Sequence, residues 1–200
     1  MASSFEIKST RPSVGETIVT IVRDHIDYRK QIFKLAGSDL RRTYRASALG
    51  WSWAIIKPLV TIFVYWFAFA IGLRRGGDIE GYPFVLWLIS GIVPWFYMSE
   101  MLTLGTECIL RNRYLVTKMK YPVSTIPTFT SISKFSVHLI LMMITILIFV
   151  ITGNELTIYL VQLPFYMLCN FLFFTGWAMF AAPIAAISTE QSIRYFLIVH

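Results

Sequence analysis

Four long runs of apolar residues alternate with shorter polar segments along this chain. The runs cover residues 51–73, 84–105, 132–152 and 156–187. An α-helix of about 20 apolar residues crosses the hydrocarbon core of a bilayer, and each run reaches that length. The pattern therefore predicts an all-α integral membrane protein, with a multi-span helical bundle in residues 49–200.

The segment before the first run is more polar. Residues 1–12 are predicted to be a flexible N-terminus. Ser13 and Glu16 fit a capping box, in which each side chain accepts a hydrogen bond from a free backbone amide at the start of a helix. Apolar residues then recur with helical spacing, at Ile18, Val22, Ile26, Ile32, Phe33 and Leu40.

Residues 13–48 are accordingly predicted to form an amphipathic helical segment, interrupted near Gly37 and Ser38. The segment carries too many charges to cross the membrane, and its pattern suits the cytoplasmic membrane surface. Packing against a partner protein is the alternative, and the two are compatible.

The C-terminal end of the chain is apolar again. After Arg194, residues 195–199 resemble the first turns of a fifth span. An apolar stub at a membrane surface is unfavourable, so we expect the transmembrane domain to be truncated here and the sequence to be a fragment.

Composition supports the membrane assignment, and charge sets its direction. Hydrophobic residues make up 56% of the chain and charged residues 14%. A net charge of +7 would favour a nucleic-acid partner in a soluble protein, but here the basic residues flank the apolar runs. Half of the 18 Lys and Arg residues precede the first run, and a basic cluster follows the second. Positive loops stay in the cytoplasm, so a cytoplasmic N-terminus and no nucleic-acid partner are predicted.

The sequence contains no motif of a soluble enzyme. It lacks the Gly-x-x-x-x-Gly-Lys-Ser/Thr phosphate loop, the His-Glu-x-x-His metal motif and the Gly-x-Ser-x-Gly nucleophile elbow. Cys108 and Cys169 show no metal-ligand or redox spacing. We expect no catalytic residue, no metal site and no cofactor in this chain, and energy for any uphill transport would have to come from another subunit.

Ionisable side chains inside the apolar runs are candidates for function. Lys57 lies one turn inside the first run and either extends to the headgroups or lines an ion pathway. Glu100 follows the proline kink expected at Pro94 and is either a functional acid or a polar contact between helices. His138 is interpreted as a packing residue rather than a proton relay.

Residues 108–131 form a basic loop between the second and third runs. Four bases surround a short amphipathic pattern that ends at Pro122. A short basic helix of this kind docks in a groove of a partner protein or lies on anionic lipid, and the composition favours neither reading.

Three motifs carry a resemblance to a known family. Residues 39–58 resemble the approach to the first span in ABC-2 type exporter permeases of cell-surface polysaccharides, on the motif Asp39-Leu40-Arg41-Arg42-x-Tyr44-Arg45-x-Ser47-x-Leu49-Gly50-x-x-Trp53-x-x-x-x-Pro58. Two later motifs look closer to the teichoic acid translocation permease branch. They are Val64-Tyr65-Trp66 with Gly81-Tyr82-Pro83-Phe84-x-x-Trp87-Leu88-x-x-Gly91-x-x-x-Trp95-Phe96, and Lys118-Met119-Lys120-Tyr121-Pro122-x-Ser124-x-Ile126-Pro127-Thr128. Their order and spacing cover most of residues 39–190.

The resemblance implies a transport mechanism. Members of the family have six spans, form a homodimer and pair with two copies of an ABC ATP-binding subunit, which would bind ATP and Mg. Rearrangement driven by ATP would move an undecaprenyl-linked polymer, such as teichoic acid or a related polysaccharide, outward through the bacterial plasma membrane and its lipids.

The resemblance also assigns roles to residues. Aromatic side chains would line the substrate channel, at Tyr65, Trp66, Phe69, Trp87, Trp95, Phe96 and Tyr97. A coupling helix near residues 112–120 would dock on the ATPase, through Arg113, Tyr114, Lys118 and Lys120. The motif at the cytoplasmic interface would use Asp39, Arg41, Arg42, Tyr44, Arg45, Gly50 and Trp53.

Three other readings remain open on the residues alone. The chain could be an ABC-2 permease for a small lipid or a drug, or a membrane assembly protein that transports nothing. A membrane glycosyltransferase would need acids near a sugar-phosphate site, for which Glu100 and Glu107 are the candidates.

Overall fold

The computed structural model describes residues 13–45, 50–72, 77–79, 81–119, 121–153 and 157–199. Within these ranges every regular secondary-structure element is a helix. The only β pairing among these residues is a single bridge between Ile79 and Tyr82. The predicted all-α class is confirmed. The prediction for residues 1–12 lies outside the described residues.

Four helical segments in the described residues are long and apolar enough to cross a membrane. They are Trp53–Gly72, Phe84–Gly105, Val123–Ile151 and Ile158–Thr189. The first joins α3 (Trp53–Trp66) to the π-helix Phe67–Gly72, and the second joins α4 (Phe84–Glu100) to the π-helix Met101–Gly105. The third is the 3₁₀ turn Val123–Thr125 with α7 (Ile126–Ile151), and the fourth is the 3₁₀ turn Ile158–Gln162 with most of α8 (Leu163–Val199).

The third span begins nine residues earlier than the sequence predicts, at Val123 instead of residue 132. The earlier turns contain Thr130 and Ser131, whose polarity is typical of a membrane interface. Both side chains are buried between helices in the structure, together with Ser133 and Lys134. Polar residues at membrane depth are tolerated when they face neighbouring helices instead of lipid, so polarity alone misplaced this boundary.

The predicted start of a fifth span is not separated from the fourth. The helix α8 continues without interruption from Leu163 to Val199 over 37 residues, which corresponds to a length of about 55 Å. This exceeds a hydrocarbon core of about 30 Å. No glycine or proline follows Pro183 before Val199, so nothing in the local sequence ends the helix.

The N-terminal amphipathic segment consists of two helices, α1 (Val14–Asp27) and α2 (Arg29–Tyr44). The capping box at Ser13 and Glu16 is present, with both reciprocal hydrogen bonds. The break lies at Tyr28 and not at Gly37 and Ser38, which is a correction to the prediction. Gly37 stays helical because its neighbour Ala36 packs on the bundle, and this packing outweighs the weak helix propensity of glycine.

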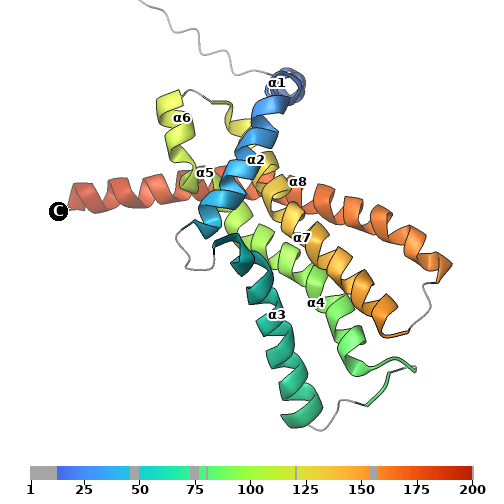
Figure 1. The fold of residues 1–200 in the computed structure, drawn as a ribbon. Helices are drawn as coiled ribbons and strands as arrows, with labels where there is room; N and C mark the ends of the chain where they lie inside the picture. The colour runs from blue at the N-terminus through green and yellow to red at the C-terminus, as the bar shows by residue number, and fades with distance from the viewer. Residues whose placement is uncertain are drawn as a thin grey trace, which may run out of the picture.

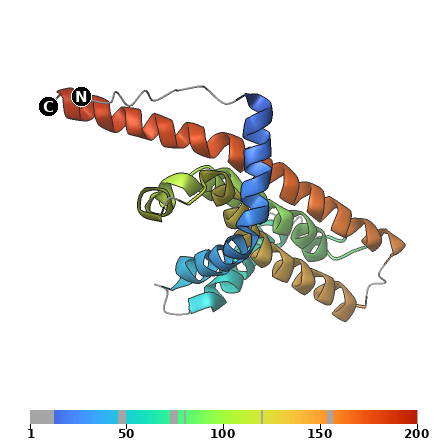
Figure 2. The ribbon, with the colours of Figure 1, turned by 90° about the horizontal axis from the view of Figure 1, so that it is seen from above.

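The helices α1 and α2 lie at the same end of the bundle as two short helices, α5 (Cys108–Arg111) and α6 (Arg113–Met119). We call this the basic end, because the arginines and lysines of α1, α2, α5 and α6 gather here. Figure 1 shows α3, α4 and α7 leaving it side by side, with α8 crossing them. Seen from above in Figure 2, α1 passes across α8, and the C-terminal part of α8 extends past the other helices.

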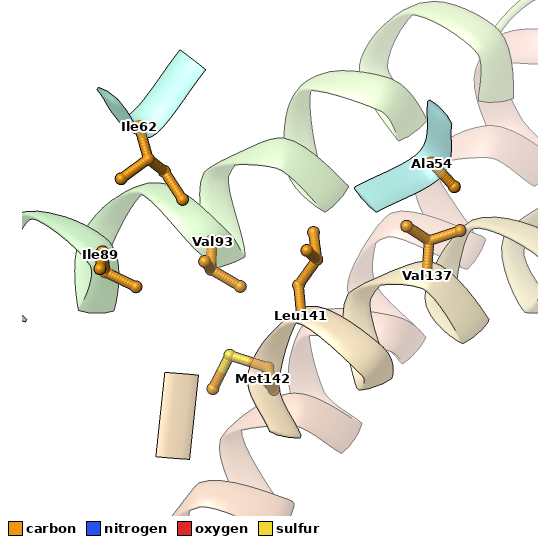
Figure 3. Close-up of a cluster of buried hydrophobic side chains, with 7 residues drawn as sticks. All are labelled: Ala54, Ile62, Ile89, Val93, Val137, Leu141 and Met142. Atoms are coloured by element: carbon orange, nitrogen blue, oxygen red, sulfur yellow. The ribbon is translucent and has the colours of Figure 1, made fainter. Parts of the chain in front are cut away.

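Among the described residues, three apolar clusters hold the helices together. The first joins α3, α4 and α7 through Ala54, Ile62, Ile89, Val93, Val137, Leu141 and Met142 (Figure 3). The second packs α2 on α5, α7 and α8 through Ile32, Ala36, Cys108, Ile126, Phe129 and Ala182. The third joins the end of the second span to α8 through Tyr97, Met101, Phe174 and Ala178.

A close approach at Gly105 secures the third cluster. A Cβ added at Gly105 would lie 3.0 Å from Met101 Cε and 3.3 Å from Ala178 Cβ. Small residues let membrane helices approach closely, which increases their packing contacts. The second span and α8 therefore depend on glycine at this position.

The outer faces of the spans remain apolar and exposed. Large side chains with more than half of their surface exposed include Phe63, Val64, Met143, Phe173 and Phe180. Exposed apolar surface on this scale is expected of a protein surrounded by lipid or by other subunits. The apolar side of α1 is exposed as well, at Ile18, Val22 and Ile26, as expected of an interfacial helix.

Candidate functional site

Two features at and near the basic end bring chemistry-bearing residues together. One is a cavity inside the membrane-spanning region, bounded by α3, α4 and α7. The other is a polar brace that joins α2 to the short helices α5 and α6.

The cavity has a volume of about 110 Å³, and charged and polar side chains line one part of it. Lys57 reaches it from α3, Glu100 from the end of α4, and Lys134 and His138 from α7. The carboxylate of Glu100 lies 4.0 Å from the ammonium of Lys134. Three residues with open roles in the sequence, Lys57, Glu100 and His138, thus line one cavity.

Lys134 is the residue that sequence reasoning missed. It lies near the start of the run 132–152, which otherwise reads as aliphatic. Its side chain is 3% exposed, whereas that of Glu100 is 35% exposed. A charge inside a membrane span is costly and marks a functional position, so this lone lysine was the available signal.

Tyr97, one of the predicted channel aromatics, is only 2% exposed and belongs to the packing between helices. Its hydroxyl shares a hydrogen bond of 2.8 Å with Ser131, and Ser131 shares one of 2.6 Å with Thr175. The ring stacks on His138 and meets Phe135 edge-on. These contacts tie α4, α7 and α8 together, so within this chain Tyr97 acts as a structural residue at the wall of the cavity.

The other predicted channel aromatics lie in several environments. Tyr65, Phe69, Trp87 and Trp95 are exposed, whereas Trp66 and Phe96 are half-buried. At the end of the bundle opposite to the basic end, ring contacts run from Tyr65 to Phe69, from Phe69 to Phe84 and from Phe84 to Trp87. This row of rings crosses from the first span to the second. It includes Phe84, which was not among the predicted channel aromatics.

The brace connects the motif before the first span to the predicted coupling segment. Arg42 donates one hydrogen bond of 3.3 Å to Asp39 and another of 3.0 Å to the side-chain oxygen of Asn112. The Asn112 amide in turn donates to the carbonyl of Cys108 at 2.8 Å. Two motifs 70 residues apart in sequence therefore meet at Arg42 and Asn112.

The remaining residues of the motif before the first span have different surroundings. Arg41 and Arg45 are exposed, and Trp53 lines the intramembrane cavity. Gly50 has a φ of 54°, a left-handed conformation that other residues rarely adopt, and it begins the turn into α3. The side chain of Tyr44 lies outside the described residues.

The predicted coupling segment near residues 112–120 contains one helix, α6, and Asn112 separates it from the preceding α5. Leu115 and Val116 pack against the second apolar cluster, while Tyr114 is 65% exposed. Arg113 and Lys118 are exposed on α6, and Lys120 lies outside the described residues. The segment thus has an anchored inner side and an outer side that carries an aromatic ring and basic charge.

Further contacts fasten α1 and α2 to the basic end. Asp24 accepts a hydrogen bond of 2.8 Å from Ser124, and a ring nitrogen of His25 lies 2.7 Å from the Thr128 hydroxyl. Burial raises the pKa of Tyr121, which meets the ring of Tyr28 edge-on. Burial also raises the pKa of the Cys108 thiol, to about 12, so this cysteine is a packing residue and not a nucleophile.

No group of three or more His, Cys, Asp or Glu side chains that could hold a metal ion occurs in the part of the chain that the structure describes. Glu100 and Glu107, the acids considered for a glycosyltransferase, lie on the second span and just after it. The cavity beside Glu100 is also lined by Lys57 and Lys134, so its charge favours an anion over a metal cation.

Comparison with known proteins identifies relatives of this chain. Residues 30–193 match the family model described as ABC-2 type transporter. The O-antigen export system permease protein RfbA of Myxococcus xanthus is 29% identical over 130 residues, which cover 64% of this chain and 48% of that protein. A Klebsiella pneumoniae protein of the same name is 28% identical over 93 residues, which cover 46% of this chain and 34% of that protein. Each match therefore spans less than half of the relative's length.

Proposed function

This chain belongs to the ABC-2 type transporter family, and we propose that it forms part of the transmembrane permease subunit of an ATP-driven exporter of a lipid-linked cell-surface polysaccharide. ATP hydrolysis would occur in a separate ABC subunit, present in two copies beside a permease homodimer. The cargo would be an undecaprenyl-linked polymer, with O-antigen-like or teichoic acid chains as the two candidates.

The observation that carries this proposal is the arrangement of the basic end. The helix α6 exposes Tyr114 and basic side chains, and its inner side is held by the second apolar cluster. The brace from Arg42 to Asn112 joins the α5–α6 segment to α2, which packs along α7. A force applied to α6 by a docked subunit would therefore reach a membrane-spanning helix through direct contacts.

Charge supports the orientation in this proposal. The arginines and lysines of α1, α2, α5 and α6 share one end, which the positive-inside rule places in the cytoplasm. An ATP-binding subunit would meet α6 on that side. The protein would thus be a multi-pass component of the bacterial plasma membrane with a cytoplasmic N-terminus.

The aromatic row from Tyr65 to Trp87 supports a sugar substrate. Exposed aromatic faces pack against the apolar faces of sugar rings, and this row lies at the end where a polymer would leave the membrane. Two relatives are named as O-antigen export permeases, which favours a polysaccharide as the class of cargo.

The test is co-expression of the complete permease reading frame with its candidate ATP-binding subunit, followed by purification in detergent. A stoichiometric complex with ATPase activity is expected. Reversing the charge of Arg113, Lys118 and Lys120 together should weaken assembly and ATPase stimulation. Reversing Arg29, Lys30 and Lys34 on α2 is the matched control, because it makes the same change in net charge.

A permease that folds and purifies without any ATPase would contradict the proposal and favour a membrane assembly protein. Unchanged assembly and stimulation in the triple variant would contradict the coupling role of α6. Loss of surface polymer on depletion of the permease, with restoration by the wild-type gene, would separate polymer export from the export of lipids.

One observation favours a second candidate, an ABC-2 permease for a small lipid or drug. A larger cavity of about 400 Å³ lies between α4, α7 and the turn before α8, and apolar residues such as Trp87, Met142 and Phe149 line it. Ligand pockets for small molecules have volumes of about 300–1,000 Å³. Binding of an apolar fluorescent probe that Phe149→Ala abolishes would support this candidate.

A further inference from the structure

We propose that Lys57 and Lys134 form a site for the phosphate group of a membrane lipid, in the cavity between α3, α4 and α7. The inference deepens the proposed function, and it rests on that function for the identity of the lipid-linked cargo. It assigns a role to charged residues that packing alone does not explain.

Charge is the first argument. Lys57 and Lys134 line the same small cavity, and Glu100 is the acid that lines it with them. Two ammonium groups and one carboxylate leave an excess of one positive charge inside a membrane-spanning region. Such a charge is costly to place in a membrane unless a partner of opposite sign compensates it.

The Glu100–Lys134 contact meets this need for a partner only in part. The two charged atoms are 4.0 Å apart, which is longer than a charge-assisted hydrogen bond of about 2.7–2.9 Å. An ammonium has three N–H donors, and that of Lys134 is almost completely shielded from water. A ligand with several acceptor oxygens would satisfy donors that Glu100 does not reach.

His138 provides a second and independent observation. It lines the cavity, the residue is 2% exposed, and its Nδ1 has no hydrogen-bond partner among the described residues. Buried polar atoms without partners are uncommon in proteins, and binding of a ligand or a water is one way to satisfy them. A polar group in the cavity would lie beside this nitrogen as well as beside the lysines.

The size and depth of the cavity select the ligand. Its volume of about 110 Å³ is smaller than the 300–1,000 Å³ of pockets for whole small molecules, so it fits a headgroup and not a sugar chain. Lys57 lies four residues from the start of the first span, and Glu100 lies five residues from the end of the second. Each residue is therefore about 6–8 Å along its helix from the basic end. Lys57 and Trp53 are exposed, which opens the cavity towards the surrounding lipid.

Two sources can supply a lipid phosphate: the diphosphate of a polyprenyl-linked cargo and the headgroup of a bulk anionic phospholipid. The experiment uses the complete permease bound to its ATPase in nanodiscs of zwitterionic lipid. Retained polyprenyl diphosphate, uncharged polyprenol and phosphatidylglycerol are measured by native mass spectrometry after each has been added at equal concentration.

Wild-type protein should retain polyprenyl diphosphate or phosphatidylglycerol, and polyprenol should bind at least tenfold more weakly. Lys57→Gln and Lys134→Gln should each weaken phosphate-lipid binding about tenfold, which is the usual effect of one hydrogen bond to a charged group. Preference for the diphosphate over phosphatidylglycerol would identify the cargo as the source, and equal binding would identify bulk lipid.

Controls keep the outcomes distinct. Lys30→Gln removes the same charge from the exposed side of α2 and should not change lipid binding. Glu100→Gln combined with Lys134→Gln removes both charges of the buried pair and keeps Lys57. It should remain as well folded as the wild type, so weaker phosphate-lipid binding by this variant would not reflect misfolding. Equal binding of polyprenol, or unchanged binding in the variants of Lys57 and Lys134, would overturn the site while the ATPase complex stays intact. Absence of the ATPase complex would instead count against the proposed function.

Discussion

For the ion pair between Glu100 and Lys134, we predict that removing one partner destabilises the protein more than removing the other. Lys134 is 3% exposed and Glu100 is 35% exposed, so the two charges depend on each other unequally. Removing one partner of a fully buried pair costs about 3–5 kcal/mol, because the other charge stays buried without compensation. Here only Lys134 is fully buried. The loss of stability in each single variant should therefore depend on which of the two charges remains.

Glu100→Gln leaves the buried ammonium without its carboxylate. We expect a cost of about 2–3 kcal/mol, below the full value, because the separation is 4.0 Å and Glu100 is partly solvated. Lys134→Met leaves a carboxylate that reaches water or headgroups and replaces the lysine stem with a side chain of similar length. Its effect should stay within about 1 kcal/mol in either direction. The double variant should be close to the wild type.

The assay is thermal unfolding of the complete permease in one detergent, followed by tryptophan fluorescence. A change of 1 kcal/mol shifts Tm by about 2–4 °C for a protein of this size, so Glu100→Gln should lower Tm by about 4–12 °C. Lys134→Met should change Tm by less than about 4 °C, and the double variant should recover most of the loss. A Glu100→Gln protein as stable as Lys134→Met would refute the reasoning, because burial of the remaining charge would then have no consequence.

Three further predictions concern packing, coupling and reactivity. Gly105→Leu should destabilise the protein by about 1–3 kcal/mol through overpacking against α8, while Gly91→Leu, where a Cβ meets nothing within 4 Å, should have little effect in the same thermal assay. Arg42→Ala should lower permease-stimulated ATPase activity several-fold by removing the brace, whereas Arg41→Ala on the exposed side should leave it intact; equal activities would contradict the brace. Cys108, with a pKa of about 12, should resist a hydrophilic maleimide at pH 8 until the protein is denatured, and labelling of the native protein within minutes would contradict its burial.

The local features near Ser13 and in the apolar runs were predictable because each depends on residues close in sequence. The capping box needs only Ser13 and Glu16, and each span needs only a sufficient length of apolar chain. Errors arose where packing with distant residues outweighed these signals. Gly37 and Ser38 remained helical because α2 packs along α7, and the start of the third span was hidden by polar residues that neighbouring helices bury.

The candidate site was only partly predictable. Lys57, Glu100 and His138 stood out as ionisable residues in apolar runs, but their meeting in one cavity depends on how α3, α4 and α7 pack. Lys134 escaped notice because it stands close to the start of the predicted run 132–152, where a lysine is ordinary. The hydrogen bond of Arg42 to Asn112 had no signal in the sequence, because neither residue indicates which partner 70 positions away it will meet.

The sequence by itself determined three things: that the protein lies in a lipid bilayer, that its fold is all-α, and which family it belongs to. Apolar length indicates a membrane protein, since four helices of about 20 or more mostly apolar residues expose a surface that lipid solvates better than water does. Spaced motifs then lead to ABC-2 permeases. Only the tertiary structure decided which polar residues are partners, that Tyr97 is a packing residue and that the motif before the first span braces α5 and α6. These outcomes depend on contacts between helices, whose energies come from distance and burial that a linear pattern does not contain.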